Sequence, residues 1–170
     1  MCEILDSGHA TMRVARFDLA AAFRASVHDV RADVGDWPIR LHVTAPDRLM
    51  IDGDDTRLRF VMETLPHNAL TYGHPGGDVT ATLSDPDGHV TLAIADAGIG
   101  IPADELEQVF ERFHRGSRVR DLGIPGTGLG LPASRLIVHR HHGTITLRPT
   151  PGGGVTATVR LPRDQPPNGL

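Results

Sequence analysis

The sequence predicts an α+β fold, a two-layer sandwich in which a mixed, mostly antiparallel sheet carries about three helices on one face. Segments with the apolar period of a helix alternate with short segments of strand periodicity along the 170 residues. Turn sequences typical of hairpins join two pairs of these strands, which favours antiparallel pairing. One domain of this length buries roughly 68 to 70% of its unfolded surface, so we expect a single core.

In the first half of the chain, a helix is followed by two short strands and a second helix. Asp18 is a favourable N-cap residue for a helix that ends near Val34. The apolar residues of this helix recur at helical spacing: Leu19, Ala22, Phe23, Val27 and Val30. The other elements expected here are strands over residues 39–44 and 48–51 and a helix from residues 53–55 to about Tyr72.

The second half contains two predicted hairpins. Asp85-Pro-Asp-Gly88 is a strong turn signal between strands over residues 78–84 and 90–95. Pro151-Gly-Gly-Gly154 separates strands over residues 144–148 and 155–161. Between the hairpins we expect a short helix from Pro102 and Ala103 to about Phe110, an irregular stretch from Arg112 to Pro125, and a helix from about Gly128 that ends before Gly143.

Two glycine-spaced loops indicate a nucleotide. Asp96-Ala-Gly98-Ile-Gly100 follows the first predicted hairpin, and Gly126-Thr-Gly-Leu-Gly-Leu131 opens the last helix. Glycine lets the backbone approach phosphate oxygens because no Cβ intervenes, and the start of a helix adds the positive end of its dipole.

The second loop also satisfies the dinucleotide pattern G-x-G-x-x-A, through Gly128, Gly130 and Ala133. That fingerprint requires a strand immediately before it and an acidic residue about 20 positions after it. Here an Arg- and Gly-rich segment precedes the pattern, and residues 148–154 contain no acid. The context therefore argues against a Rossmann site.

The composition argues against a nucleic-acid-binding protein, a disulfide-bonded protein and a membrane-spanning protein. A net charge of -4 and a pI of about 6.2 argue against a nucleic-acid partner. All 17 basic side chains are Arg, so any cationic contact to phosphate must come from Arg or His. The one cysteine, Cys2, cannot form an intramolecular disulfide and favours a reducing compartment. No apolar run approaches the ~18 residues of a membrane span, so we expect a soluble, cytoplasmic protein.

Four sequence boxes stand in a fixed order around these loops. They are an N box at His67-Asn68-Ala69, the first glycine box at residues 96–100, a phenylalanine box at Phe110-Glu-Arg-Phe-His-Arg115, and the second glycine box at residues 126–131. This ordered set resembles the catalytic, ATP-binding domain of sensor histidine kinases, within the superfamily that includes gyrase, the Hsp90 chaperones and MutL. The resemblance covers about residues 17–162 and implies the Bergerat-type sandwich of that superfamily.

The resemblance assigns base recognition to residues near the first glycine box. Asp96 is similar to the carboxylate that accepts a hydrogen bond from the adenine 6-amino group, which would disfavour the 6-oxo group of GTP. Gly98 and Gly100 would let the chain turn under the base, with Ile99 or Ile101 as an apolar wall. Tyr72 resembles the aromatic residue that packs near adenine and ribose.

The resemblance assigns phosphate and Mg²⁺ binding to residues of the N box and the second glycine box. Asn68 resembles the residue that binds Mg²⁺, an ion that accepts a single amide oxygen and keeps several waters. The second glycine box would offer backbone amides to the phosphates: Gly126, Thr127, Gly128, Leu129 and Gly130. Arg115, in the Arg-rich segment that forms a lid in the family, is the candidate catalytic contact to phosphate. Phe110 and Phe113 are expected to pack the base of the lid onto the core.

Several positions depart from the family pattern. Thr64 stands where the family has Asn, or a water-activating Glu in the ATP-hydrolysing relatives. Thr71 is counted among the nucleotide-binding positions, but the family often has Lys there, which predicts weak ATP affinity. Pro66 should kink the N-box helix at a cost of roughly 3 kcal/mol unless the structure adapts. A kink that shifts the register would bring Glu63 toward the position of Thr64.

The resemblance implies a kinase that acts on a partner. It predicts transfer of the γ-phosphoryl group of Mg·ATP to a His of a dimerisation and phosphoacceptor domain, with a response regulator acting indirectly. His28 mimics an acceptor box but lies within the ATP-binding domain and lacks the Pro-Leu that follows. We expect residues 1–16 to be a remnant or linker and residues 163–170 to be a disordered tail. The chain is then either a segment of a longer kinase or the ATP-binding half of a split kinase.

Two other functions remain open at this point. A serine kinase of the anti-sigma-factor type shares the fold as a chain of similar length. A degenerate nucleotide-binding module that only docks a partner would fit Thr64, Pro66 and Thr71. A cluster of His139, His141 and His142 resembles a metal site, but it closes a helix, where cations suit the C-terminal dipole.

Overall fold

A five-stranded sheet forms one layer of the protein. The computed structural model describes residues 11–35 and 38–164. The strand order is β2-β4-β5-β7-β6, and only β2 and β4 are parallel. The strands span Arg40–Thr44 (β2), Asp78–Ser84 (β4), His89–Asp96 (β5), Thr144–Pro149 (β6) and Val155–Pro162 (β7). The mixed, mostly antiparallel sheet expected from the sequence is therefore confirmed.

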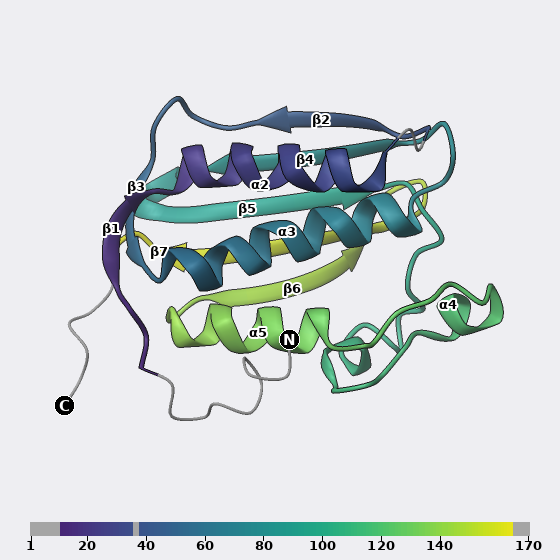
Figure 1. Ribbon diagram of the computed structural model, residues 1–170. Coiled ribbons are helices and arrows are strands. Elements are labelled where there is room, and N and C mark those ends of the chain that lie inside the picture. The colour runs from purple at the N-terminus through teal and green to yellow at the C-terminus, as the bar shows by residue number, and fades with distance from the viewer. Residues whose placement is uncertain (1–10, 36–37, 165–170) are drawn as a thin grey trace.

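Three long helices form the second layer and cover one face of the sheet (Figure 1). They are α2 (Leu19–Val34), α3 (Asp55–Tyr72) and α5 (Gly130–Arg140). Their apolar sides and the inward residues of the strands share one continuous core, in which Phe23, Leu70 and Ile94 are among the buried side chains. This is the predicted two-layer sandwich.

Asp18 begins α2 as its sequence suggested. Its carboxylate accepts hydrogen bonds from the backbone amides of Ala20 and Ala21, and Oδ1 also accepts one from the amide of Leu49. The bond from Leu49, followed by the two helix amides, lowers the pKa of Asp18. The cap therefore joins the start of α2 to the strand region before α3.

A small second sheet closes one end of the sandwich. Strand β1 (Ala15–Asp18) pairs antiparallel with β3 (Met50–Gly53). The sequence did not indicate β1, and β3 begins two residues after the strand expected over 48–51. The amide of Arg13 donates to the carboxylate of Asp54, so ordered contacts begin before the expected domain start at residue 17. Residues 1–10 and 165–170 of the expected terminal segments lie outside the described residues.

The connection between β5 and α5 differs from the expectation in two places. Residues 102–110 form hydrogen-bonded turns and a short 3-10 helix, η2 (Gln108–Phe110), instead of an α-helix. The side-chain amide of Gln108 donates to the carbonyl of Asp104, which competes with the backbone bond that an α-helix would make there. The stretch expected to be irregular contains a short helix, α4 (Ser117–Asp121).

Pro66 lies inside α3 without ending it, because the helix runs from Asp55 to Tyr72. The last helix begins at Gly130, two residues later than expected, and Pro132 occupies its first turn as predicted.

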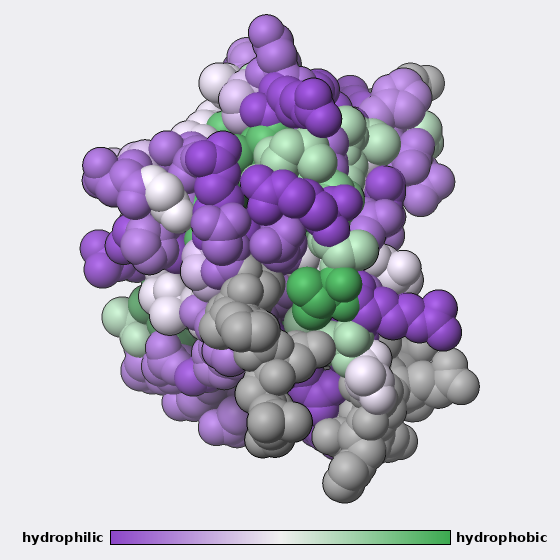
Figure 2. Space-filling view, turned by 90° about the vertical axis from the view of Figure 1, so that its left-hand side faces the viewer, coloured by the Kyte–Doolittle hydropathy of each residue, from purple (hydrophilic) through white to green (hydrophobic). Residues whose placement is uncertain are grey.

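The end of the molecule that carries β1 and β3 is mostly hydrophilic, with apolar atoms in small separate patches (Figure 2). None of the helices within residues 11–35 and 38–164 combines the length and apolarity that a membrane span requires.

Candidate nucleotide-binding site

A cavity of about 680 Å³ lies between α3, the end of β5, the lid segment (residues 112–125) and the start of α5. It brings together eleven of the predicted site residues: Asn68, Thr71, Tyr72, Asp96, Gly100, Ile101, Arg115, Gly126, Thr127, Gly128 and Gly130. The lid segment projects from the end of the sandwich that is opposite β1 (Figure 1). Predicted residues separated by up to 62 positions in the chain thus surround one volume.

Asp96 ends β5 and is fixed by backbone amides from two segments. Its Oδ1 accepts from the amide of Gly98 at 2.8 Å and from the amide of Val155 at 3.3 Å. Burial raises the pKa of this carboxyl group, while the two amides and His74 act in the opposite direction. Both of these bonds use Oδ1, so Oδ2 is the oxygen available to an additional donor.

Gly98 was expected to let the chain turn under the base, and it does not itself line the cavity. A Cβ on Gly98 would lie 2.1 Å from the carbonyl oxygen of Tyr72, so only glycine permits this approach. The amide of Ile99 donates to the same carbonyl at 3.1 Å. Ile99 and Ile101 both line the cavity, and Ile101 also packs on the core.

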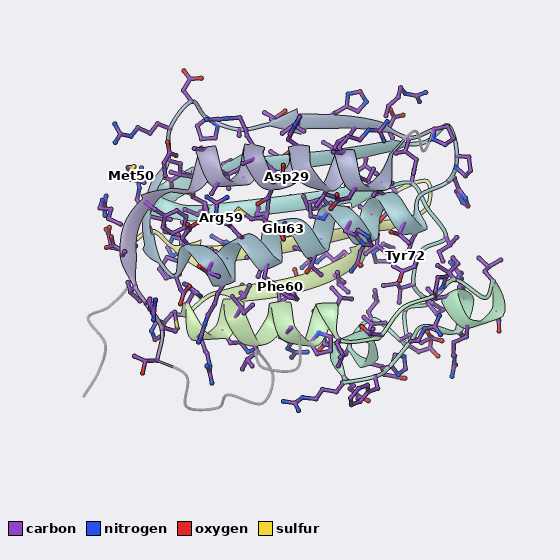
Figure 3. All side chains as sticks on the ribbon, in the orientation of Figure 1. Asp29, Met50, Arg59, Phe60, Glu63 and Tyr72 are labelled. Carbon is purple, nitrogen blue, oxygen red and sulfur yellow. The ribbon has the colours of Figure 1, made fainter. Side chains whose placement is uncertain are left out.

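Tyr72 lies at the end of α3 that faces the lid segment (Figure 3). Its side chain is half-buried, and burial raises the pKa of the phenol while Arg115 lowers it. A Cβ placed on Gly126 would lie 3.6 Å from the Tyr72 hydroxyl. Tyr72 therefore lies between the first glycine loop and the second.

Helix α3 presents the N-box residues to the cavity. Asn68 and Thr71 line it, and Thr71 Oγ1 is 3.5 Å from Nδ1 of His67. Thr64 is half-buried, with its methyl carbon 2.9 Å from the position of a Cβ on Gly130. Glu63 also lines the cavity but is exposed, near the middle of α3 (Figure 3). The continuous helix keeps Thr64 in register, so the shift that would have replaced it with Glu63 does not occur.

Side chains of the lid segment bind backbone carbonyls around the cavity. Arg115 donates to the carbonyl of Ile124, and Arg118 donates to that of Ile99. The amide of Ser117 donates to Glu105 at 2.8 Å. The Ser117 hydroxyl, followed by this amide, lowers the pKa of the Glu105 carboxyl group.

Two buried nitrogen atoms at the cavity lack a hydrogen-bond partner among the described residues. They are Nε of Arg115 and Nε2 of His114, and both residues line the cavity. Buried polar groups are normally paired, because leaving one unpaired costs about 1–3 kcal/mol. These atoms are therefore well suited to meet acceptor oxygens of a ligand.

The two phenylalanines of the phenylalanine box behave differently. Phe110 is buried as predicted, with the Arg135 guanidinium 4.9 Å above its ring. Phe113 is 72% exposed and does not pack on the core, so its expected role was wrong. Its backbone has φ = 63° and its amide donates to the carbonyl of Gly128 at 3.1 Å. That backbone pairing holds residue 113 at the surface while tying it to the second glycine loop.

The second glycine loop approaches the lid backbone closely. Gly128 has φ = 68°, and a Cβ there would lie 2.6 Å from the carbonyl oxygen of His114. Leu129 is not part of the cavity wall. Its side chain is buried in a small cluster with Ala133, Phe60 and Leu136, so only its backbone could meet a nucleotide.

Several cavity residues escaped the sequence analysis. His114, Pro125, Leu147, Val155 and Ala157 line the wall. The position of His114 next to Arg115 was a usable signal. Leu147, Val155 and Ala157 gave none, because alternating apolar residues in a strand indicate only a core-facing side.

The C-terminal histidines of α5 have a structural role centred on His141. His141 is fully buried, its Nδ1 lies 2.8 Å from the carbonyl of Ile137, and its Nε2 accepts from the amide of Asp54 at 2.9 Å. This pairing requires a neutral ring, and burial lowers the pKa of His141. The imidazole therefore joins the end of α5 to the start of α3, and it does so as a neutral group, not as the cation expected for a helix end.

Comparison with known proteins agrees with this geometry. A family model described as "Histidine kinase-, DNA gyrase B-, and HSP90-like ATPase" matches residues 53–165. The chain is similar to the sensor-like histidine kinase SenX3 of Mycobacterium tuberculosis, with 37% identity over 137 residues, 81% of this chain and 33% of SenX3. The histidine-protein kinase BaeS of Escherichia coli is 32% identical over 160 residues, 94% of this chain and 34% of BaeS.

A solved structure shares the architecture. The mycobacterial sensor histidine kinase MprB matches with a TM-score of 0.77 and 30% identity, and the match covers 90% of this chain and 99% of that one. The chain spans about a third of the length of the two curated relatives.

Proposed function

Because this chain belongs to the histidine kinase-, DNA gyrase B- and HSP90-like ATPase family, we propose that it binds Mg·ATP and delivers the γ-phosphoryl group to a histidine of a separate phosphoacceptor domain or chain. A response regulator would take the phosphoryl group afterwards, in the cytoplasm. Similarity to SenX3 and BaeS over about a third of the length of each kinase supports this assignment.

Base recognition is assigned to Asp96, with Tyr72, Gly100 and Ile101 as neighbours. Oδ1 of Asp96 is engaged by backbone amides, so Oδ2 would accept the adenine 6-amino group. A 6-oxo group would face that oxygen acceptor to acceptor and be rejected. Burial of the carboxylate strengthens this discrimination, because an unmatched buried charge is costly.

The phosphates are assigned to the other half of the cavity. Asn68 offers an amide oxygen on the cavity side of α3, which suits one position of an octahedral Mg²⁺ site. When bound, the ion would neutralise charge that develops on the phosphates during transfer. Backbone amides of Gly126, Thr127, Gly128, Leu129 and Gly130 would surround the phosphate oxygens, with Thr71 adding a hydroxyl instead of a charge.

The observation that carries the proposal is the pair of unpaired buried nitrogens beside these loops. Nε of Arg115 and Nε2 of His114 would donate to phosphate oxygens. The imidazole of the acceptor would attack the γ-phosphorus as the bond to the β–γ bridging oxygen breaks, with ADP leaving. Phosphoryl transfer needs little covalent chemistry from the protein, so positioning and charge neutralisation are sufficient roles for these residues.

Labelling with γ-labelled ATP tests the function. The chain is incubated with Mg²⁺ and candidate two-helix phosphoacceptor proteins, and the label on the partner is tested for acid stability. Acid-labile label on a partner histidine, lost with the Asn68→Ala variant, is the expected result. Acid-stable label on serine would instead identify a serine kinase of the anti-sigma-factor type. No label on any partner, despite ATP binding, would identify a non-catalytic module, for which Thr64 and Thr71 are the supporting positions.

A further inference from the structure

The turn between β6 and β7 packs against the first glycine loop. Thr150 accepts from the amide of Gly153 at 3.0 Å, and its own amide donates to the carbonyl of Gly154 at 3.1 Å. Its hydroxyl lies 2.9 Å from that of Thr156. These bonds fix the shape of a turn that the sequence analysis treated only as a hairpin connection.

Gly154 brings this turn into direct contact with Asp96. A Cβ on Gly154 would lie 2.0 Å from the carbonyl oxygen of Asp96 and 2.6 Å from its Oδ1. Gly154 is buried and has φ = 85°. On its other side, a Cβ on Gly100 would lie 3.6 Å from the Gly154 carbonyl oxygen. The backbones of the two loops are therefore packed at a distance that no other residue type permits.

This packing places the Val155 amide, the second donor to the Asp96 carboxylate, within hydrogen-bonding distance of it. The amide of Val155, the residue after Gly154, donates to Oδ1 of Asp96 at 3.3 Å, beside the bond from Gly98 at 2.8 Å. Two donors from separate segments fix one oxygen, and the direction of the other oxygen is fixed with it. The end of β7 nearest the cavity thus determines how Asp96 faces its ligand.

We propose that Gly154 is a positioning residue for base recognition: the close approach of β7 that it permits aims the free oxygen of Asp96 at the 6-amino group of adenine. The proposal rests on the proposed function, because it assumes that Asp96 reads the base. Gly154 would not touch the nucleotide itself. It would act through the Val155 amide and the Asp96 carboxylate.

Gly152, in the same turn, provides a matched control. Its φ of 90° is similar to that of Gly154, but a Cβ on Gly152 would have no neighbouring atom within 4 Å. Alanine at either position carries the same kind of backbone strain. Only alanine at Gly154 has to push β7 away from Asp96.

The experiment measures the dissociation constants of ATP and inosine triphosphate in the full chain with Mg²⁺. The two bases differ in the 6-amino or 6-oxo group and in the N1 proton that accompanies the oxo form. The variants are Gly154→Ala, Gly152→Ala and Asp96→Asn. The ratio of interest is the dissociation constant of inosine triphosphate divided by that of ATP. We expect this ratio to fall about tenfold in Gly154→Ala, the size typical of losing one charge-assisted hydrogen bond. The ratio should keep its wild-type value in Gly152→Ala. Far-UV circular dichroism and thermal unfolding establish that each variant is folded.

The outcomes separate the two proposals. A wild-type ratio in folded Gly154→Ala would overturn the role of Gly154, provided Asp96→Asn loses the discrimination. A wild-type ratio in Asp96→Asn, or no ATP binding by the wild type, would overturn base recognition by Asp96 and with it this inference. If Gly154→Ala does not fold, Val155→Pro decides, since it removes the amide at the first residue of a strand, where proline is tolerated. A fall in its ratio supports the role, and an unchanged ratio overturns it.

Discussion

The first glycine loop (residues 96–100) and the lid segment line the same cavity, but different kinds of contact hold them. Backbone atoms fix the first glycine loop: Ile99 donates to Tyr72, and Gly98 approaches the same carbonyl so closely that a Cβ is excluded. The lid segment has backbone bonds as well, but here the side chains of Arg115 and Arg118 also bind carbonyls. Backbone packing is hard to exchange, whereas a guanidinium can leave a carbonyl for a phosphate.

This difference suggests a division of labour between the halves of the cavity. The base half is built before any ligand arrives, because Asp96, Gly98 and Val155 already hold one another. In the phosphate half, the Arg115 guanidinium donates to a neutral carbonyl. Nε of Arg115 and Nε2 of His114 have no partner among the described residues. Recognition of the base would then need little rearrangement, while engagement of the phosphates would reorganise the lid.

The largest expected effect concerns stability. In Gly98→Ala the new Cβ would meet the Tyr72 carbonyl oxygen at 2.1 Å, so β5 and the end of α3 must separate. We expect the free energy of unfolding to fall by about 3 kcal/mol, the upper range for overpacking a rigid contact. Gly126→Ala, whose Cβ has its nearest neighbour at 3.6 Å, should stay within about 0.5 kcal/mol of wild type.

Denaturant unfolding checks both values. Equal stability losses in the two variants would show that the close approach of Gly98 to the Tyr72 carbonyl does not constrain the first glycine loop.

The next effect concerns nucleotide affinity. Arg115→Ala removes a charged donor from the phosphate half, and we expect ATP affinity to fall by about 2 kcal/mol, or roughly 30-fold. Arg120→Ala is the matched control, because Arg120 belongs to the same segment but is exposed and does not line the cavity. Isothermal titration calorimetry with Mg·ATP measures both. Similar losses in the two variants would indicate a general electrostatic attraction and not a specific contact of Arg115.

The smallest effect is a pH dependence at the end of the sandwich opposite the cavity, where His141 joins the end of α5 to the start of α3. His141 accepts from the Asp54 amide as a neutral ring, and burial lowers its pKa in the folded state below the ordinary value of 6.5. As the pH falls, His141 is therefore protonated in the unfolded chain before it is protonated in the folded chain. Stability is fully present above pH 6.5 and should decrease as the pH falls below it.

Unfolding measured between pH 7.5 and 5.5 tests this linkage. His141→Gln should be less stable overall and lack that part of the dependence of stability on pH. His139→Gln, at an exposed position in α5, should keep the wild-type dependence. A wild-type slope in His141→Gln would rule out His141 as its source.

Sequence periodicity was sufficient for most of the fold. The three long helices and the five strands of the main sheet follow from apolar spacing, from the Asp18 cap and from turns rich in Gly and Pro. It could not predict β1, because a four-residue strand with an exposed pattern has no apolar alternation. Nor could it predict that residues 102–110 form turns and a 3-10 helix, in which the side chain of Gln108 bonds to the carbonyl of Asp104.

The site was predictable as a set of residues but not as an arrangement. Glycine spacing marked both loops, yet it could not distinguish Gly98, which supports the loop, from Gly100, which lines the cavity. Apolar character suggested that Phe113 would be buried, but its backbone pairing with Gly128 places it at the surface. Gly154 gave only a turn signal, because its contact with Asp96 joins positions 58 residues apart.

Hydrogen exchange with and without Mg·ATP tests the division of the cavity most directly. We expect the amides of Gly98 and Ile99 to be protected before nucleotide is added and to change little afterwards. The amides of residues 126–130 and of the lid segment should gain protection on binding. If the first glycine loop instead exchanges freely until ATP is present, or if the lid amides do not respond to it, the account of a fixed base half and a reorganising phosphate half is wrong.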